Sequence, residues 1–284
     1  MLKTYYQLTK PGIVYGNVFT TLAAFLFASH WYFPPFLLFA TLVGVALVIA
    51  SACVFNNYLD RSIDLKMPRT KDRALVTGAI SVTSALIYAT VLGLIGFALL
   101  FIYTNTLTGF VVVFGFIFYV VIYGIGKRAS HWGTVLGSVA GAVPLLAGYT
   151  AVMGRLDTTA LILFLILAFW QMPHFYAIAL YRIDEYRSAS IPVLPLQKGA
   201  KTTKIYILLY IAAFTLAASA LSLFGFAGYT YRAGVLILGA IWFWRGAQGF
   251  RAQNDSLWAR KLFLFSLIVL VAFSVLLSVA WALP

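Results

Sequence analysis

Nine runs of apolar residues, each long enough to cross a bilayer, constrain the fold of this chain more than any other feature. A transmembrane helix needs ~20 mostly apolar residues, because lipid offers no partners for free backbone N–H and C=O groups. The pattern predicts an all-α membrane protein with nine transmembrane helices in one domain over residues 1–284. The expected spans are 11–29, 36–58, 80–102, 107–125, 133–152, 158–180, 203–224, 229–245 and 261–282.

Composition supports the same class. Charged residues make up 10% of the chain and the mean hydropathy is +0.96, whereas a soluble domain carries about 25% charged residues. The net charge of +13 does not indicate a nucleic-acid partner, because the bases are spread over short loops between apolar runs. The single cysteine, Cys53, excludes an intramolecular disulfide and a multi-cysteine metal site.

The basic residues predict the orientation of the chain in its membrane. Of the 20 Lys and Arg residues, only Arg155 and Arg232 fall on the opposite side from the others. The positive-inside rule then places the N-terminus in the cytoplasm and the C-terminus in the periplasm. Run 11–29 exceeds a signal-peptide core of ~7–15 residues and no A-x-A site follows, so we expect it to remain uncleaved. No transit-type segment precedes it, which favours a bacterial inner membrane.

Acidic residues are rare and clustered. The chain has seven, and all but Asp157 and Asp255 lie in two short segments after the second and sixth runs. Acids are costly near a bilayer, so two clusters at the ends of apolar runs indicate a functional site on the cytoplasmic side. The clusters contain Asp60, Asp64 and Asp72 in the first segment, and Asp184 and Glu185 in the second.

The first cluster forms a ladder of oxygen-bearing side chains, Asn56, Asp60 and Asp64, spaced four apart. If the second span stays helical, each step turns by only ~40° and rises ~6 Å. Like charges at this spacing repel by ~0.2–0.5 kcal/mol, and carboxylates near a helix C-terminus oppose its dipole. A divalent cation would remove both costs, and Mg²⁺ accepts such oxygens while sharing its shell with substrate phosphates.

Basic residues follow the ladder on a loop that Pro68 separates from the helix. Arg69, Lys71 and Arg73 could hold a diphosphate beside the metal. The alternative is a solvated loop whose acids merely balance its bases, but the regular ladder favours the functional interpretation.

The second cluster is less decisive. Asp184 and Glu185 are flanked by Arg182 and Arg187, so they fit either a second Mg²⁺ site facing the first or a charged interface segment with internal pairs. His174 precedes them by about two helical turns. A histidine within an apolar helix is either a hydrogen-bonded packing residue or a ligand, and imidazole commonly binds heme iron.

Several motifs resemble a known family. Asn56-x3-Asp60-x3-Asp64 followed by MPRTKDR is similar to the signature of the UbiA superfamily of intramembrane prenyltransferases. The chain further resembles the heme o synthase branch in LTKPG, YGIGKRAS, WQMPHFYAIALYR, Glu185-Tyr186 and IPVLPLQKG. These blocks run in the family's order over essentially the whole chain.

The resemblance implies a fold and a reaction: a UbiA-type helical bundle that transfers a farnesyl group from farnesyl diphosphate to a vinyl group of heme b. Water captures the resulting cation to give heme o. The implied site comprises Asn56, Asp60 and Asp64 as Mg²⁺ ligands, with Asp184 and Glu185 as further candidates; Arg69, Arg73, Lys127 and Arg128 for diphosphate; and His174, Arg182 and Arg187 for heme. The implied partners are both substrates, the bilayer and a downstream heme-modifying enzyme or terminal oxidase.

One departure from the wider superfamily bears on the alternatives. Many quinone-type members carry a second Asp-x3-Asp ladder, whereas Asp184 is followed four residues later by Ser188. This departure disfavours prenylation of an aromatic quinone precursor and leaves a second metal open. Two other readings are a cation-coupled transporter, which should carry acids near mid-membrane, and a heme-binding assembly factor, which would need His174 but not Asp60 or Asp64.

Overall fold

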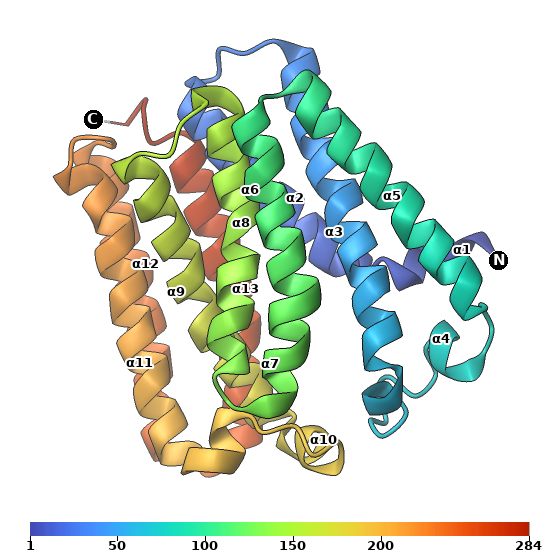
Figure 1. Cartoon of the computed structure of the whole chain (residues 1–284). Coiled ribbons are helices and arrows are strands. Elements are labelled where there is room, and N and C mark those ends of the chain that lie inside the picture. Colours follow the sequence, from blue (N-terminus) through green and yellow to red (C-terminus); the bar gives the residue numbers. More distant parts are fainter. Residues whose placement is uncertain (284) are drawn as a thin grey trace.

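The computed structural model describes residues 1–283, and every regular element within that range is helical (Figure 1). In chain order the elements are α1 (Leu2–Leu8), α2 (Pro11–Ser29), α3 (Pro35–Asp64), α4 (Ala74–Thr77), α5 (Val82–Tyr103), α6 (Thr106–Ile117), the π-helix η1 (Phe118–Tyr123), α7 (Gly124–Ala129), α8 (Gly133–Met153), α9 (Thr158–Tyr181), α10 (Ile183–Ser188), α11 (Leu194–Leu223), α12 (Tyr229–Ala247), the 3-10 helix η2 (Gln248–Arg251) and α13 (Asp255–Ser278).

Membrane-spanning helices dominate the fold, as the apolar runs predict. Within residues 1–283, eight helical segments are long and apolar enough to cross a bilayer, so the chain is a multi-pass membrane protein. The remaining expected span, 229–245, forms α12 (Tyr229–Ala247), which packs against α11 and α13 but is not among those eight. The count of nine spans and the orientation of the termini therefore stay predictions.

The helix ends differ from the expected ones where polar residues begin or extend a helix. Helix α3 continues past residue 58 to Asp64, which keeps the ladder helical as the spacing predicts. Helix α13 begins at Asp255 rather than 261, because the Asn254 side chain caps it by accepting a hydrogen bond from the Leu257 N–H at 3.0 Å. Hydropathy alone does not detect such polar starts.

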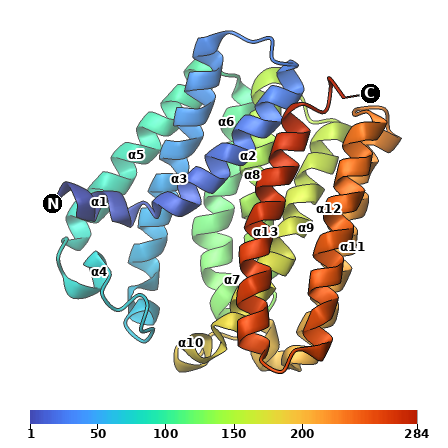
Figure 2. The same ribbon diagram turned by 180° about the vertical axis from the view of Figure 1, so that it is seen from behind.

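The bundle places both acidic clusters at one end. Helices α3 and α5 pack together along one edge, while α9 and α11 pack together at the other (Figure 1). Figure 2 shows α2 and α13 across the opposite face. The end of α3, the short helix α4, α7 and α10 all lie at the same end of the molecule. The segments that carry the acids and most of the bases therefore meet there.

A close helix contact fixes the position of α3. Helices α3 and α5 approach through Gly44 and Gly96: a Cβ added at Gly96 would lie 2.9 Å from the Gly44 carbonyl oxygen. Small residues permit this approach, which supplies the packing that apolar surface alone cannot supply in lipid.

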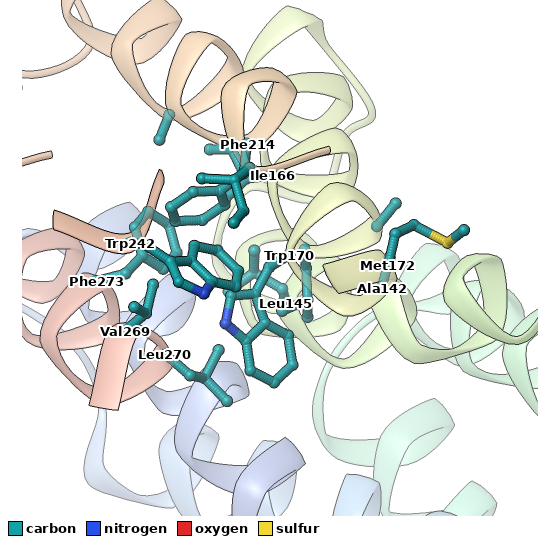
Figure 3. Packing of buried hydrophobic residues seen from close by; sticks show 14 of the residues in the cluster. Ala142, Leu145, Ile166, Trp170, Met172, Phe214, Trp242, Val269, Leu270 and Phe273 are labelled. Carbon is teal, nitrogen blue, oxygen red and sulfur yellow. The ribbon is translucent and has the colours of Figure 1, made fainter. Parts of the chain in front are cut away.

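The main core lies on the other side of the bundle, among α8, α9, α11, α12 and α13. Trp242, Phe214 and Phe273 are fully buried there, with Trp170 beside them (Figure 3). Phe214 meets Trp242 and Phe273 edge to face, with ring centroids 5.5 and 5.6 Å away. This packed half lies opposite α3, and a cavity opens between the two.

Candidate functional site

A cavity of about 820 Å³ lies between α3 and the packed half of the bundle. Asn56, Asp60 and Asp64 all line it and are only 2%, 7% and 4% exposed. Their spacing of four residues puts them on one face of α3, and that face is turned inward. The sequence predicts the ladder, and the structure adds that all three side chains face a space large enough for a small-molecule substrate.

Asp60 is held by two cations from a distant part of the chain. Lys127 Nζ, on α7, forms an ion pair with Asp60 Oδ2, and Arg128 Nη2 lies 3.2 Å from Asp60 Oδ1. Arg128 also donates a hydrogen bond to the Leu59 carbonyl oxygen at 2.5 Å. These contacts bring two expected diphosphate-binding residues to the middle of the ladder.

Asp64 is held by a cation from the loop that follows α3. Arg73 Nη1 lies 2.6 Å from Asp64 Oδ2 and donates a weaker bond to Asn57 Oδ1 at 3.3 Å. The loop can fold back because the Thr70 hydroxyl, itself buried, donates to the Asp64 carbonyl oxygen at 2.9 Å. This bond satisfies a backbone acceptor that the end of a helix leaves free.

Asn56 contacts Lys10. In the sequence, Lys10 is only one of the bases that indicate the cytoplasmic side of the membrane. Lys10 Nζ donates to Asn56 Oδ1 at 3.1 Å, while Asn56 Nδ2 is buried without a partner among the described residues. Lys10 has a left-handed backbone (φ 52°), which is uncommon for a non-glycine residue. Burial, together with the nearby Arg73 and Lys127, lowers the pKa of Lys10 to about 8.

The second acidic cluster divides into one residue that pairs with arginines of the cavity and one that pairs on the surface. Glu185 accepts from Arg182 Nη1 at 2.5 Å, and its Oε2 lies 3.5 Å from Arg69 Nε. Asp184 instead pairs with Arg187 on the surface, where these side chains are 85% and 62% exposed. Asp184, Glu185 and Arg187 do not line the cavity themselves, whereas both partners of Glu185, Arg69 and Arg182, do.

A π-helix turns two tyrosines toward the polar end of the cavity. Tyr119 and Tyr123 on η1 line the cavity with their rings stacked 5.5 Å apart, and Lys127 Nζ lies 5.1 Å from the centre of the Tyr123 ring. π-Helical turns are rare and are frequent at functional sites. Tyr186 also lines this end, and burial raises the pKa of its hydroxyl.

The far wall of the cavity is aromatic and apolar. His174 lines it together with Trp170, Phe263 and Leu270. The His174 ring stacks on Trp170 at 4.8 Å and meets Phe263 at 5.0 Å. The cavity therefore has a charged end at the ladder and an apolar, aromatic wall that carries one imidazole.

The charged side chains at the polar end of the cavity favour the binding of an anionic ligand together with a metal cation. Three carboxylates (Asp60, Asp64 and Glu185) are outnumbered by six basic side chains: Lys10, Arg69, Arg73, Lys127, Arg128 and Arg182. Within residues 1–283, no three His, Cys, Asp or Glu side chains converge as a metal-binding group. The ladder offers two carboxylates and an amide oxygen, a donor set that fits Mg²⁺ when phosphate oxygens complete its shell.

Sequence reasoning identifies most of this site but misses some residues. The structure brings together all of the expected metal and diphosphate residues except Asp184, and all of the expected heme residues except Arg187. Lys10, Tyr119 and Tyr123 were not anticipated. LTKPG marks Lys10 only as part of a motif, and no sequence pattern distinguishes a π-turn from an α-turn within an apolar run.

Comparison with known proteins identifies a family and full-length relatives. Residues 17–282 match the UbiA prenyltransferase family. The protoheme IX farnesyltransferase of Sodalis glossinidius (strain morsitans) is 49% identical over 286 residues, covering 100% of this chain and 96% of that protein. The protein of the same name from Cronobacter sakazakii is 48% identical, with coverage of 100% and 97%.

Solved structures with the same fold are much less similar in sequence. A digeranylgeranylglyceryl phosphate synthase superposes with a TM-score of 0.81 at 18% identity, covering 98% of both chains. A UbiA homologue from Archaeoglobus fulgidus, bound to GPP and Mg²⁺, gives a TM-score of 0.73 at 16% identity, covering 97% of this chain and 99% of that one. The likeness to these structures concerns the fold.

Proposed function

The chain belongs to the UbiA prenyltransferase family, and on that premise we propose that it transfers the farnesyl group of farnesyl diphosphate to a vinyl group of heme b, giving heme o and diphosphate. One observation carries the proposal: the buried Asp60–Asp64 ladder and the aromatic wall with His174 line the same cavity. A diphosphate at the ladder and a planar, iron-containing acceptor at the wall would therefore meet. The full-length relatives named protoheme IX farnesyltransferase support this choice of substrates.

The ladder residues are the proposed Mg²⁺ ligands. Asp60 and Asp64 would hold the ion with Asn56, and we include Glu185 rather than the exposed Asp184 because Glu185 pairs with Arg69 and Arg182, which line the cavity. When bound, Mg²⁺ supplies electrostatic stabilisation of the departing diphosphate. The ladder's present partners, Arg73, Lys127 and Arg128, are then free to face phosphate oxygens, together with Arg69.

The basic side chains favour cleavage of the donor. The allylic C–O bond breaks, its electron pair leaves with the diphosphate, and fixed cations stabilise the developing charge without reorganisation. The stacked faces of Tyr119 and Tyr123 adjoin this end of the cavity, and aromatic faces attract cations such as an allylic carbocation.

The vinyl group of heme b then attacks the farnesyl cation, and water completes the reaction. The terminal vinyl carbon of heme b bonds to the first farnesyl carbon, which leaves a cation on the inner vinyl carbon. Water adds there and releases one proton, forming the hydroxyethylfarnesyl group. His174 and Arg182 are the proposed heme contacts, Arg182 through a propionate.

We also propose a membrane and an orientation for the chain. We place the chain in a bacterial inner membrane with the ladder end toward the cytoplasm and the C-terminus in the periplasm. The support is the position of the acidic clusters and most bases at one end of the bundle (Figure 1). The carboxylates lie at this end beside bases, which suits phosphate binding better than a mid-membrane transport path.

The proposal is tested in cells that lack farnesylated heme. Expression of the chain should produce a heme that is heavier than heme b by one farnesyl group and one hydroxyl group, measured by mass spectrometry of extracted hemes. Unmodified heme b in cells that contain abundant, folded protein would contradict the proposal.

A further inference from the structure

Ser266 joins α13 to α9 through two different groups. Its carbonyl oxygen accepts a hydrogen bond from Trp170 Nε1 at 2.9 Å, and its hydroxyl lies 2.8 Å from His174 Nδ1. Trp170 and His174 are one helical turn apart on α9 and stack on each other. One buried serine thus contacts both rings of the aromatic wall.

The bonds of the Ser266 hydroxyl determine the tautomer of His174. A serine hydroxyl has one proton to donate and two lone pairs to accept with. Ser266 Oγ donates its proton to the Phe263 carbonyl oxygen at 2.6 Å. Toward His174 it can therefore only accept, so Nδ1 carries the ring proton and Nε2 is left with the lone pair of the neutral imidazole.

The surroundings of His174 keep this lone pair unused. The ring lies among Trp170, Phe175 and Phe263, and none of the ion pairs found within residues 1–283 involves it. Among the residues that the structure describes, hydrogen bonds to the ring engage Nδ1 alone. A neutral imidazole whose N–H is held by an oxygen acceptor is the usual form of a metal-binding histidine, because that bond fixes the ring and raises its basicity.

We propose that Ser266 is a positioning residue for heme: its hydroxyl holds His174 so that Nε2 binds the iron of the heme substrate from the apolar wall of the cavity. The inference rests on the proposed function, which makes heme b the acceptor. It assigns His174 as an axial ligand rather than a packing contact, and it gives a role to a serine within an apolar run. Heme carries its own four equatorial nitrogens, so a single histidine suffices.

The test measures heme binding without farnesyl diphosphate. The full chain in lipid nanodiscs is titrated with ferric heme b, and absorption, electron paramagnetic resonance and, after reduction, the iron–histidine stretch in resonance Raman are recorded. Ser266→Ala removes only the hydroxyl and leaves the backbone bond to Trp170. Ser266→Thr restores a hydroxyl. Ser274→Ala is the matched control, because Ser274 lies on the same helix, is buried, and its hydroxyl has no partner among the described residues.

The expected result is a histidine-ligated spectrum for the unaltered chain and its loss in His174→Gly, with free imidazole restoring it. Ser266→Ala should weaken heme affinity by roughly 10- to 100-fold and lower the iron–histidine stretching frequency. Ser266→Thr should recover most of both, and Ser274→Ala should match the unaltered chain. Equal behaviour of Ser266→Ala and Ser274→Ala, or an unchanged spectrum in His174→Gly, would overturn the inference.

Failure of the inference and failure of the proposed reaction give different results. Conversion of heme b by the same preparations is measured separately after adding farnesyl diphosphate and Mg²⁺. Full conversion with no histidine ligation would overturn the role of Ser266 alone. Histidine ligation that depends on Ser266, with no conversion, would support this role while contradicting the reaction.

Discussion

Arg69 Nε and Glu185 Oε2 lie 3.5 Å apart, and this pair joins the loop after α3 to the short helix α10. The Ser188 hydroxyl lies near the same junction, 2.8 Å from the Glu185 carbonyl oxygen to which it donates and 3.3 Å from the Lys66 carbonyl oxygen. Two acidic clusters that are far apart in the chain are therefore connected at one cavity, the first directly and the second through the cavity-lining Arg69 and Arg182. In the second cluster only Glu185 makes this connection, since Asp184 pairs with Arg187 on the surface.

Glu185 and Asp184 differ in their partners and exposure, so their substitutions should have different effects on activity. Glu185→Gln should lower kcat/KM for farnesyl diphosphate by about tenfold or more, because Arg69 and Arg182 lose the charge that orients them. Asp184→Asn should change it by less than about twofold, since exposed ion pairs contribute little. Steady-state kinetics on both variants checks this, and equal effects would contradict the assignment of Glu185.

The ladder predicts a loss of rate that is separable from unfolding. Asp60→Glu keeps the charge that pairs with Lys127 and Arg128 but moves the carboxylate by one methylene. We expect the thermal midpoint to stay close to that of the unaltered chain while kcat falls at least about 100-fold, because metal and diphosphate require exact placement of the oxygens.

Asp157 provides the control for the ladder. It caps α9 at the other end of the bundle, accepting from the Ala160 N–H and the Tyr149 hydroxyl. Asp157→Ala should destabilise the protein by about 0.5–2 kcal/mol because the cap is lost, and it should leave the kcat of the folded fraction unchanged. A loss of rate as large as that of Asp60→Glu would show that the ladder has no special role.

Arg182 and Arg187, which flank the second acidic cluster, should contribute differently to heme binding. Arg182 lines the cavity, whereas Arg187 is on the surface. Arg182→Ala should raise the KM for heme b several-fold with little change in the KM for farnesyl diphosphate, because a propionate loses its cation. Arg187→Ala should leave both values unchanged; a larger effect at Arg187 than at Arg182 would contradict the proposed heme position.

The contact between α3 and α5 should control stability. A Cβ at Gly96 would lie 2.9 Å from a backbone oxygen of Gly44, which cannot move aside. Gly96→Ala should therefore lower the thermal midpoint, with a cost of about 1–3 kcal/mol from overpacking. Gly234→Ala, whose Cβ would meet only the flexible Leu276 side chain at 3.1 Å, should cost less. Thermal unfolding in lipid nanodiscs compares them.

Much of this architecture could be predicted from the sequence because its determinants are periodic. Apolar runs predict spans, and residues four apart predict a shared helix face, as the ladder on α3 confirms. Which acid of the pair Asp184–Glu185 faces inward could not be predicted. Successive residues on a helix differ by ~100° in direction, and only the packing of α10 fixes that direction.

Other parts of the site depend on contacts between distant segments. The pairing of Asp60 with Lys127 requires α7 to pack beside α3, and the positions of Tyr119 and Tyr123 require a local π-turn. Ser266 gives no sequence signal, since a lone serine in an apolar helix usually bonds its own backbone. Its role emerges only from the geometry of His174.

The central claim is that one cavity joins a metal-assisted diphosphate site to a heme acceptor. The most direct measurement follows both products in one reaction of the purified chain with heme b, farnesyl diphosphate and Mg²⁺. We predict that one diphosphate is released for each heme that gains a farnesyl and a hydroxyl group, and that chelation of Mg²⁺ stops both. Diphosphate release with heme b unchanged, or heme modification that persists in Asp60→Asn and Asp64→Asn, would contradict the account.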